Sequence, residues 1–347
     1  MSTIAMIGAG GWGTAMAVLL RKNGHRIRLY ARKKEFAVEL RKTRKNQKYL
    51  PSAVLAEDIK ITSDLDEAVS QADIVMVAVP SHGMRETSRA LAKVLTGREI
   101  LISMAKGLEQ DTFLRMSEVI GQELPHTPSD QICALSGPNI ADEVSRGIPT
   151  ATVIATKKKS LADDLQQVIM GPAMRVYTHH DLIGVEIGGA LKNIIAISVG
   201  VADGLNFGDN TRATLITRGL AEMARLGFAM GGELLTFAGL SGLGDLVCTC
   251  TSPHSRNHSA GILIGRGEKV KNILSGTDMV IEGVKAAKVG YQLAQKYQVE
   301  LPITRETYRV LYENKKPSDA VVSLMGREGR YEIEESRTKR KAEWEKR

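Results

Sequence analysis

Short apolar runs alternate with segments of helical period through the first half of the chain. A run that is apolar at nearly every position, such as residues 72–80, is typical of a strand buried on both faces of a sheet. Strands that alternate with helices predict a doubly wound, mostly parallel α/β sheet, whose ligands bind at the carboxyl ends of the strands. The other expected strands are residues 4–7, 26–30, 99–104, 132–135 and 151–155.

The pattern changes near Asp181, after which helical spacing dominates and strand signals are scarce. Apolar positions that start at Ile187 and recur at helical spacing up to Ser198 predict the core-facing stripe of one long helix. Two further helices are expected at residues 213–226 and 280–297. The sequence thus predicts an α/β domain over residues 1–181, an all-α domain over 182–335 and a charged tail over 336–347.

A glycine-rich turn joins the first expected strand to a helix of small residues. In Gly8-Ala-Gly-Gly-Trp-Gly13, Gly8 permits a tight turn, Gly10 lets a ligand approach the backbone, and Gly13 lets the helix pack closely. The free N–H groups at the helix start then face an anion. This order predicts a Rossmann domain that binds the pyrophosphate of a dinucleotide; an ordinary strand–helix turn is the alternative.

The end of the second expected strand bears on which dinucleotide binds. NAD-binding units usually carry Asp or Glu there to hold the ribose 2′-hydroxyl, but this chain has Arg32 and Lys33. A carboxylate would repel a 2′-phosphate, whereas a guanidinium binds it. The sequence therefore favours NADPH, with NADH as the second choice; a solvated basic turn is the alternative.

The chain carries a net charge of +8 over 347 residues, which raises the question of a nucleic-acid partner. Residues 21–60 hold 13 Lys and Arg against 4 Asp and Glu, so this one segment accounts for the excess. It follows the glycine turn, where it can attract an anionic cofactor or substrate. Since no nucleic-acid-binding signature is present, we expect a small-molecule partner and no nucleic acid.

Composition and cysteine usage indicate the compartment. A hydrophobic share of 43% and a charged share of 25% are typical of a soluble enzyme. The N-terminus lacks the apolar core of a signal peptide, and no apolar run is expected to reach membrane-spanning length. The cysteines Cys133, Cys248 and Cys250 favour a reducing compartment over a disulfide framework. We expect a cytoplasmic enzyme without a membrane span.

Lys192 is the first candidate for chemistry, because it stands in the apolar, small-residue stretch of the long helix. Burial lowers the pKa of a lysine towards neutrality, which suits proton transfer. Adjacent glycines are expected to let cofactor or substrate approach the helix. Asp245, on a glycine loop, is a carboxylate that can orient Lys192 or a substrate hydroxyl. A surface lysine and ordinary turn chemistry are the alternatives.

A hydroxyl, a guanidinium and a carboxamide stand together at Ser255, Arg256 and Asn257, a combination that suits phosphate recognition. Here too, loop capping is the alternative. The nearby cysteines 248 and 250 with two histidines superficially resemble a zinc site, but their spacing is shorter than zinc sites use. We expect no metal.

Taken together, these segments resemble the bacterial NAD(P)-dependent glycerol-3-phosphate dehydrogenases almost throughout the chain. The resemblance implies a Rossmann domain followed by an all-α domain, and hydride transfer between NAD(P)H and dihydroxyacetone phosphate. The product, sn-glycerol 3-phosphate, supplies the backbone of glycerophospholipids, and a homodimer is the candidate assembly. The matching stretches are 8–15, 79–81, 106–109, 136–138, 184–193, 212, 216–223, 239–246, 249–251 and 255–257.

The resemblance also implies roles for individual residues. Lys192 matches the proton donor and acceptor. The implied substrate residues are Lys106, Gly137, Asn139, Lys192, Asp245, Ser255, Arg256 and Asn257. The implied cofactor residues are Gly8, Gly10, Gly11, Trp12, Gly13, Arg32, Lys33, Lys106, Ala141, Arg256, Val280 and Glu282.

Two positions depart from the family pattern. The family often has Ser where this chain has Gly11, so only backbone contact is expected there. It commonly has Ser or Thr where this chain has Asn139, which can still form hydrogen bonds. Two other functions stay open on the residues alone: a dehydrogenase acting on a β-hydroxy acid or a sugar, and a non-catalytic NADP-sensing module.

Overall fold

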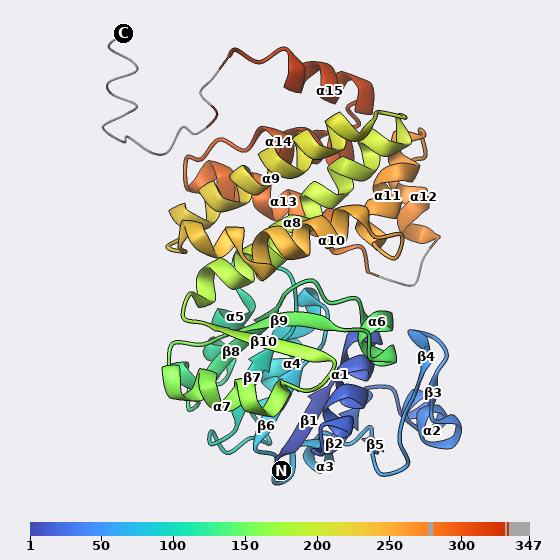
Figure 1. Cartoon of the computed structure of the whole chain (residues 1–347), viewed down its shortest axis with the longest axis vertical. Helices are drawn as coiled ribbons and strands as arrows, with labels where there is room; N and C mark the ends of the chain where they lie inside the picture. Colours follow the sequence, from blue (N-terminus) through green and yellow to red (C-terminus); the bar gives the residue numbers. More distant parts are fainter. Residues whose placement is uncertain (277–279, 330–331, 333–347) are drawn as a thin grey trace.

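The chain forms an α/β domain and a helical domain, stacked end to end in the computed structural model, which describes residues 1–276, 280–329 and 332 (Figure 1). One eight-stranded sheet, in the order β10-β9-β8-β7-β6-β1-β2-β5, forms the centre of the first domain. Its strands are β1 (Thr3–Ile7), β2 (Arg26–Tyr30), β5 (Lys60–Thr62), β6 (Ile74–Val77), β7 (Ile100–Ser103), β8 (Ile132–Ser136), β9 (Thr150–Ala155) and β10 (Met174–His179).

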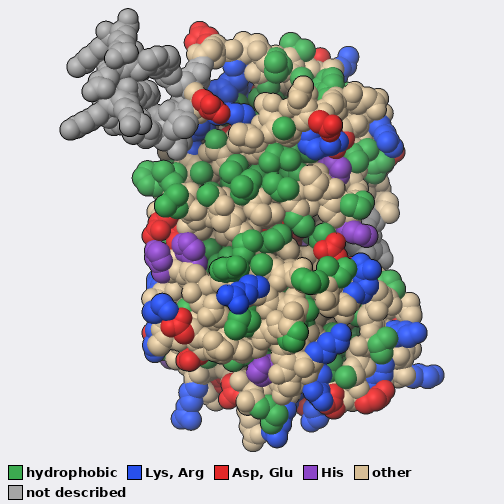
Figure 2. Space-filling view, viewed as in Figure 1, with side chains coloured by type: hydrophobic (Ala, Val, Ile, Leu, Met, Phe, Trp, Pro, Cys, Tyr) green, Lys and Arg blue, Asp and Glu red, His purple; other side chains and the backbone are tan. Residues whose placement is uncertain are grey.

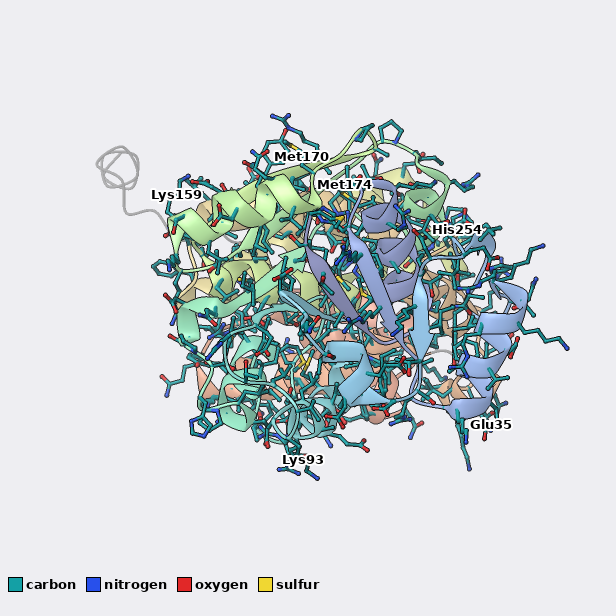
Figure 3. The ribbon with its side chains drawn as sticks, turned by 90° about the horizontal axis from the view of Figure 1, so that it is seen from below. Glu35, Lys93, Lys159, Met170, Met174 and His254 are labelled. Atoms are coloured by element: carbon teal, nitrogen blue, oxygen red, sulfur yellow. The ribbon has the colours of Figure 1, made fainter. Side chains whose placement is uncertain are left out.

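Helices cover both faces of this sheet, which confirms the doubly wound α/β prediction. Seen from below, Lys159 at the start of α7 and Lys93 beyond the end of α4 mark its opposite sides (Figure 3). Ile4 and Met6 pack with the helix α1 on one face, whereas Ala5 and Ile7 face the other. The helices are α1 (Gly11–Lys22), α2 (Lys34–Thr43), α3 (Leu65–Val69), α4 (Met84–Leu91), α5 (Met116–Glu123), α6 (Ala141–Arg146) and α7 (Lys159–Ile169), with short turns η1 (Ser81–Gly83) and η2 (Ser129–Gln131).

Every strand pair of this sheet is parallel except β8 with β9. The connection between these two strands carries α6, which packs against α1 instead of crossing the sheet, so the chain returns antiparallel. The sequence pattern missed β5 and β10. It also missed the hairpin of β3 (Lys45–Asn46) and β4 (Leu50–Val54).

The second domain is built around α8 (Leu182–Gly204), which Asp181 caps by accepting a hydrogen bond from the Gly184 N–H at 2.8 Å. Gly200 of α8 lies so close to Gly261 that a side chain at either position would clash, which brings α8 and α11 into close contact. The other elements are η3 (Leu234–Ala238), η4 (Leu240–Gly244), α9 (Asp209–Ala229), α10 (Asp245–Thr251), α11 (Arg256–Gly265), α12 (Val270–Ser275), α13 (Glu282–Lys296), α14 (Pro302–Tyr312) and α15 (Pro317–Met325).

The length of α8 corrects one expectation. At 23 residues it is long and apolar enough to cross a membrane, although no run of that length was expected. However, 89% of its most apolar window is buried inside the structure, as in the core helix of a folded domain. The predicted charged tail, residues 336–347, lies outside the described residues.

Candidate active site between the two domains

The turn between β1 and α1 leaves space and backbone donors for an anion. Gly8 has a φ of +117°, and a Cβ there would lie 2.7 Å from the carbonyl oxygen of Ala78, so glycine is required. At Gly10, a Cβ would meet no described atom within 4 Å. No described side chain caps α1, so its first N–H groups stay free. The buried Trp12 indole N–H also lacks a described acceptor. We call this turn and the first residues of α1 the glycine cradle; a dinucleotide pyrophosphate fits it.

Packing explains the other two glycines of the turn. A Cβ on Gly13 would clash with the carbonyl oxygen of Gly8. A Cβ on Gly11 would lie 3.0 Å from the carbonyl oxygen of Tyr49 and 3.8 Å from the Cβ of Ala141. Tyr49 was not a predicted site residue, since it comes from a basic loop without periodic pattern. The short distance shows that the Tyr49 backbone lies against the turn, and the missing side chain of Gly11 leaves room for that backbone.

Arg32 and Lys33 follow the end of β2 after the single residue Ala31, and both side chains are exposed. The Arg32 guanidinium lies 3.7 Å from the Glu86 carboxylate of α4, and both groups are well hydrated. Such an exposed pair contributes little to stability, so Arg32 can exchange it for another anion.

The centre of the site is one buried carboxylate that binds two lysines from different domains. Asp245 of α10 accepts hydrogen bonds from Lys192 of α8 and, at 2.7 Å, from Lys106, which follows β7. Lys192 is only 5% exposed, which rules out a surface lysine. It also donates to the Thr249 hydroxyl at 2.7 Å, and Lys106 donates to the Gly137 carbonyl at 2.7 Å. An ammonium has three donors, so each lysine keeps one N–H for a further acceptor.

The pKa of Lys192 is lowered to about 8, chiefly by burial and in addition by the positive charge of Lys106. The Asp245 carboxylate opposes both effects by stabilising the ammonium. A pKa near the working pH is what a proton donor and acceptor needs.

The glycines beside Lys192 act differently from the prediction. A Cβ on Gly188 would lie 2.7 Å from the carbonyl oxygen of Ser241, and one on Gly189 would lie 2.8 Å from the Ser136 hydroxyl. Protein atoms therefore fill the space that was expected to admit cofactor or substrate. These glycines instead let α8 pack tightly against η4 and β8.

Of Ser255, Arg256 and Asn257, which were predicted to bind a phosphate, only Arg256 has a side chain that forms no hydrogen bond with another described residue. Ser255 caps α11 by accepting the His258 N–H at 3.3 Å. Asn257 is buried, donates to the Asn193 carboxamide at 2.8 Å and accepts the Gly283 N–H at 2.9 Å. The exposed Arg256 guanidinium makes no hydrogen bond or ion pair within the described part of the chain. Arg256 is thus the available anion-binding group.

The side chain of Asn139 is engaged by β9. It donates to the Ala151 carbonyl at 3.0 Å and accepts the Thr152 hydroxyl at 3.0 Å. These bonds hold the loop that begins at Gly137, whose φ is +144°. Asn139 therefore shapes this loop and keeps one N–H to spare.

Glu282 reaches from the helical domain to the end of β6. It begins α13 and accepts hydrogen bonds from the Ser81 N–H at 3.2 Å and the Ser81 hydroxyl at 2.8 Å. Val280 is half-buried just before it, and residues 277–279 lie outside the described residues. Ser81 and Asn193 were not predicted as site residues. Two signals could have indicated them: Ser81 directly follows an expected strand, and Asn193 is next to Lys192 in the sequence.

The cysteines and histidines near α10 do not gather around one point. His258 instead pairs with Asp203 at 2.7 Å, and Cys250 is buried. Among the residues described, no three His, Cys, Asp or Glu side chains could hold a metal ion together. A surface hollow lined by residues 149–150 and 170–175 contains none of the predicted site residues. Met170 and Met174, two of its lining residues, are labelled in Figure 3.

A glycine cradle for a dinucleotide and a buried lysine with a depressed pKa, brought together by two domains, define a nicotinamide-dependent oxidoreductase. Models of NAD-dependent glycerol-3-phosphate dehydrogenases match residues 3–162 with the N-terminal part and 181–322 with the C-terminal part. The chain therefore belongs to the NAD-dependent glycerol-3-phosphate dehydrogenase family.

Individual relatives agree over nearly the whole length. The chain is 49% identical over 334 residues to a glycerol-3-phosphate dehydrogenase [NAD(P)+] of Fusobacterium nucleatum, covering 96% of this chain and 99% of the relative. A Bacillus subtilis enzyme of the same name is 46% identical, with coverages of 96% and 97%. The crystal structure of a Coxiella burnetii glycerol-3-phosphate dehydrogenase superposes with a TM-score of 0.89 at 36% identity, covering 94% and 99% of the chains.

Proposed function

We propose that this protein reduces dihydroxyacetone phosphate to sn-glycerol 3-phosphate with NADPH or NADH, and catalyses the reverse reaction. The observation that carries this proposal is the Lys192–Asp245–Lys106 centre, which leaves one ammonium N–H on each lysine for a substrate oxygen. The family to which the chain belongs supports the choice of substrate. A non-catalytic cofactor sensor would have no use for such a centre.

Each of these residues then has its own role in the reducing direction. The nicotinamide, when bound, supplies the hydride. Lys192 donates its proton to the ketone oxygen as negative charge develops there, and Asp245 and Thr249 hold the ammonium in place. Lys106 hydrogen-bonds the substrate from the other domain. Arg256 binds the phosphate through charge-assisted hydrogen bonds, which fixes the ketone beside Lys192.

Product identity tests the proposal. Incubation of the protein with NADPH and dihydroxyacetone phosphate is expected to give the phosphorus NMR signal of glycerol 3-phosphate. A stereospecific enzymatic assay is expected to identify the sn enantiomer. Cofactor binding without any such product would support the sensor function instead.

We further propose that the cofactor is preferentially NADPH. Replacing Arg32 with Glu is expected to reverse the preference, because a carboxylate repels a 2′-phosphate and accepts the 2′-hydroxyl of NADH. A ratio of kcat/KM for NADPH to that for NADH at least tenfold lower than in the wild type is expected. The exposed Lys93 is the control, since its replacement by Glu introduces the same charge elsewhere. An unchanged ratio in Arg32→Glu would show that Arg32 does not discriminate.

We also propose a homodimer formed through an apolar patch on the helical domain. The patch consists of the exposed side chains Phe228, Leu234, Leu235, Leu243 and Val247. Of their elements, α9 and η4 each contact the other three of η3, η4, α9 and α10. Apolar side chains gather over α9 and α10 on this face (Figure 2). These five side chains are between 38% and 84% exposed, so an interface of standard size, about 800 Å² per partner, would bury apolar surface that the single chain leaves in water.

Light scattering during size-exclusion chromatography tests the dimer. The wild type is expected to run at twice the 37.7 kDa of one chain, and Leu235→Asp at that of a monomer. Leu235 is 84% exposed, so the substitution leaves the core intact. Val322→Asp on α15, outside the patch, is expected to stay dimeric. A monomeric wild type, or a dimeric Leu235→Asp protein, would contradict this interface.

A further inference from the structure

One face of α8 lies against the α/β domain along its first half. Glu186, Gly189 and Asn193 recur at i, i+3 and i+7 and so share this face. Glu186 binds Ser117 at the start of α5, Gly189 lies against Ser136 of β8, and the Asn193 carboxamide reaches the Lys106 carbonyl at 3.4 Å. Lys192, one residue away, points instead to α10.

The segment from Lys106 to Ser117 is hydrogen-bonded at both ends to this face of α8. An antiparallel bridge between Leu108 and Arg115 closes it into a short hairpin, so its two ends lie together. On the side of the α/β domain, Glu109 of this hairpin binds Arg85 of α4 through two hydrogen bonds of 2.7 and 2.6 Å. The position of Lys106 is therefore set by groups on both domains.

Glu186 of α8 is the charged group that binds the Ser117 end of this segment. Its side chain is 4% exposed and accepts hydrogen bonds from Arg115 at 2.6 Å, from the Ser117 N–H at 2.8 Å and from the Ser117 hydroxyl at 2.6 Å. Burial raises the pKa of Glu186, and Arg115 opposes this effect. A buried carboxylate with three donors from the other domain is costly to disturb, since each partner would be left unsatisfied.

We propose that Glu186 is a positioning residue for the reaction: by holding Arg115 and Ser117 against α8, it fixes the Lys106 ammonium relative to Asp245 and Lys192. The proposal rests on the proposed function, in which Lys106 touches the substrate. Lys106 makes hydrogen bonds of 2.7 Å to both Asp245 and the Gly137 carbonyl. A misplacement of about 1 Å in such a centre can cost about 100-fold in rate.

Glu222 provides a matched control within the same domain. It is also a buried glutamate that caps a helix, accepting hydrogen bonds from the Thr304 N–H at 3.0 Å and the Thr304 hydroxyl at 2.9 Å. Its partners lie on α14, and among the described residues it forms no hydrogen bond with the Lys106 segment. Glu186→Gln and Glu222→Gln therefore make the same chemical change at a buried carboxyl group, but only the first is expected to loosen the attachment between domains.

Steady-state kinetics of the two variants test the proposal. Glu186→Gln is expected to lower kcat/KM for dihydroxyacetone phosphate by about 10- to 100-fold, with NADPH affinity unchanged. Glu222→Gln is expected to lower the melting temperature but to leave kcat and KM as in the wild type. A wild type without turnover would refute the proposed function itself, whereas wild-type kinetics in Glu186→Gln would refute only the positioning role.

The pH profile supplies a readout that a purely structural role would not move. Lys106 lowers the pKa of Lys192, whereas Asp245 and Cys248 on α10 raise it. If Lys106 moves away, the pKa of Lys192 rises, so the limb of the kcat/KM profile near pH 8 should shift upwards in Glu186→Gln. If this variant fails to fold, Ser117→Ala, which removes one donor and keeps the ion pair, is expected to show the same shift. An unmoved limb in the folded variant would overturn the proposal.

Discussion

Replacing Lys192 with alanine is expected to lower kcat for dihydroxyacetone phosphate by at least about 1,000-fold, within the range attributed to a positioned acid or base. The variant loses the proton donor and leaves the buried Asp245 with only Lys106 as an ionic partner. NADPH affinity, measured by fluorescence titration, is expected to stay within about twofold, because the cradle at α1 is untouched. Lys288→Ala, an exposed lysine of α13, is the control. Turnover near that of the wild type would rule Lys192 out as the proton donor.

The pH dependence gives a second, independent check on Lys192. Reduction needs the ammonium form, so kcat/KM in that direction should fall as the pH rises through about 8. Oxidation needs the neutral amine, so kcat/KM in that direction should rise over the same interval. Residual activity in Lys192→Ala is expected to lack this limb. A limb that persists in the variant would belong to another group.

Replacing Arg256 with alanine is expected to raise KM for dihydroxyacetone phosphate and to lower kcat/KM by roughly 100-fold. A hydrogen bond to a charged group contributes about 1.5–3 kcal/mol, and the Arg256 guanidinium is free to form such bonds with a phosphate. Dihydroxyacetone, which lacks the phosphate, provides the internal control, since its slow reduction should be the same in both proteins.

A matched variant distinguishes the loss of phosphate binding by Arg256 from a general loss of positive charge. Arg266, just beyond the end of the same helix α11, is exposed, and Arg266→Ala is expected to leave KM unchanged. A KM within twofold of the wild type in Arg256→Ala would show that another group binds the phosphate.

Strands buried on both faces could be predicted from sequence, whereas the edge strands could not. β6 is apolar throughout, and β1 and β7 are apolar apart from one terminal hydroxyl residue each, because helices cover both faces of the sheet there. In β10, at the sheet edge, buried Met174 and Val176 alternate with the exposed Arg175 and Tyr177. That pattern is weaker than a continuous run, so β10 was missed.

Residue chemistry indicated the centre of the site but not its hydrogen-bond partners. A lysine in an apolar helix and a carboxylate on a glycine loop were recognisable, and the fold brings Lys192 and Asp245 together from 53 positions apart. Polar residues that are neighbours in sequence did not act together, because Ser255 and Asn257 bind the protein's own backbone and side chains. The direction in which each side chain points depends on how α11 is rotated about its axis against its neighbours, which the sequence pattern does not reveal.

The most direct test of the central claim is NADPH oxidation by the wild type with dihydroxyacetone phosphate against a panel of 2-ketoacids. We expect a kcat/KM for dihydroxyacetone phosphate at least about 1,000-fold above that of any ketoacid, because in the proposed function Lys106 and Lys192 bind the ketone and Arg256 binds the phosphate, which a ketoacid lacks. Equal or faster turnover of a ketoacid would contradict it.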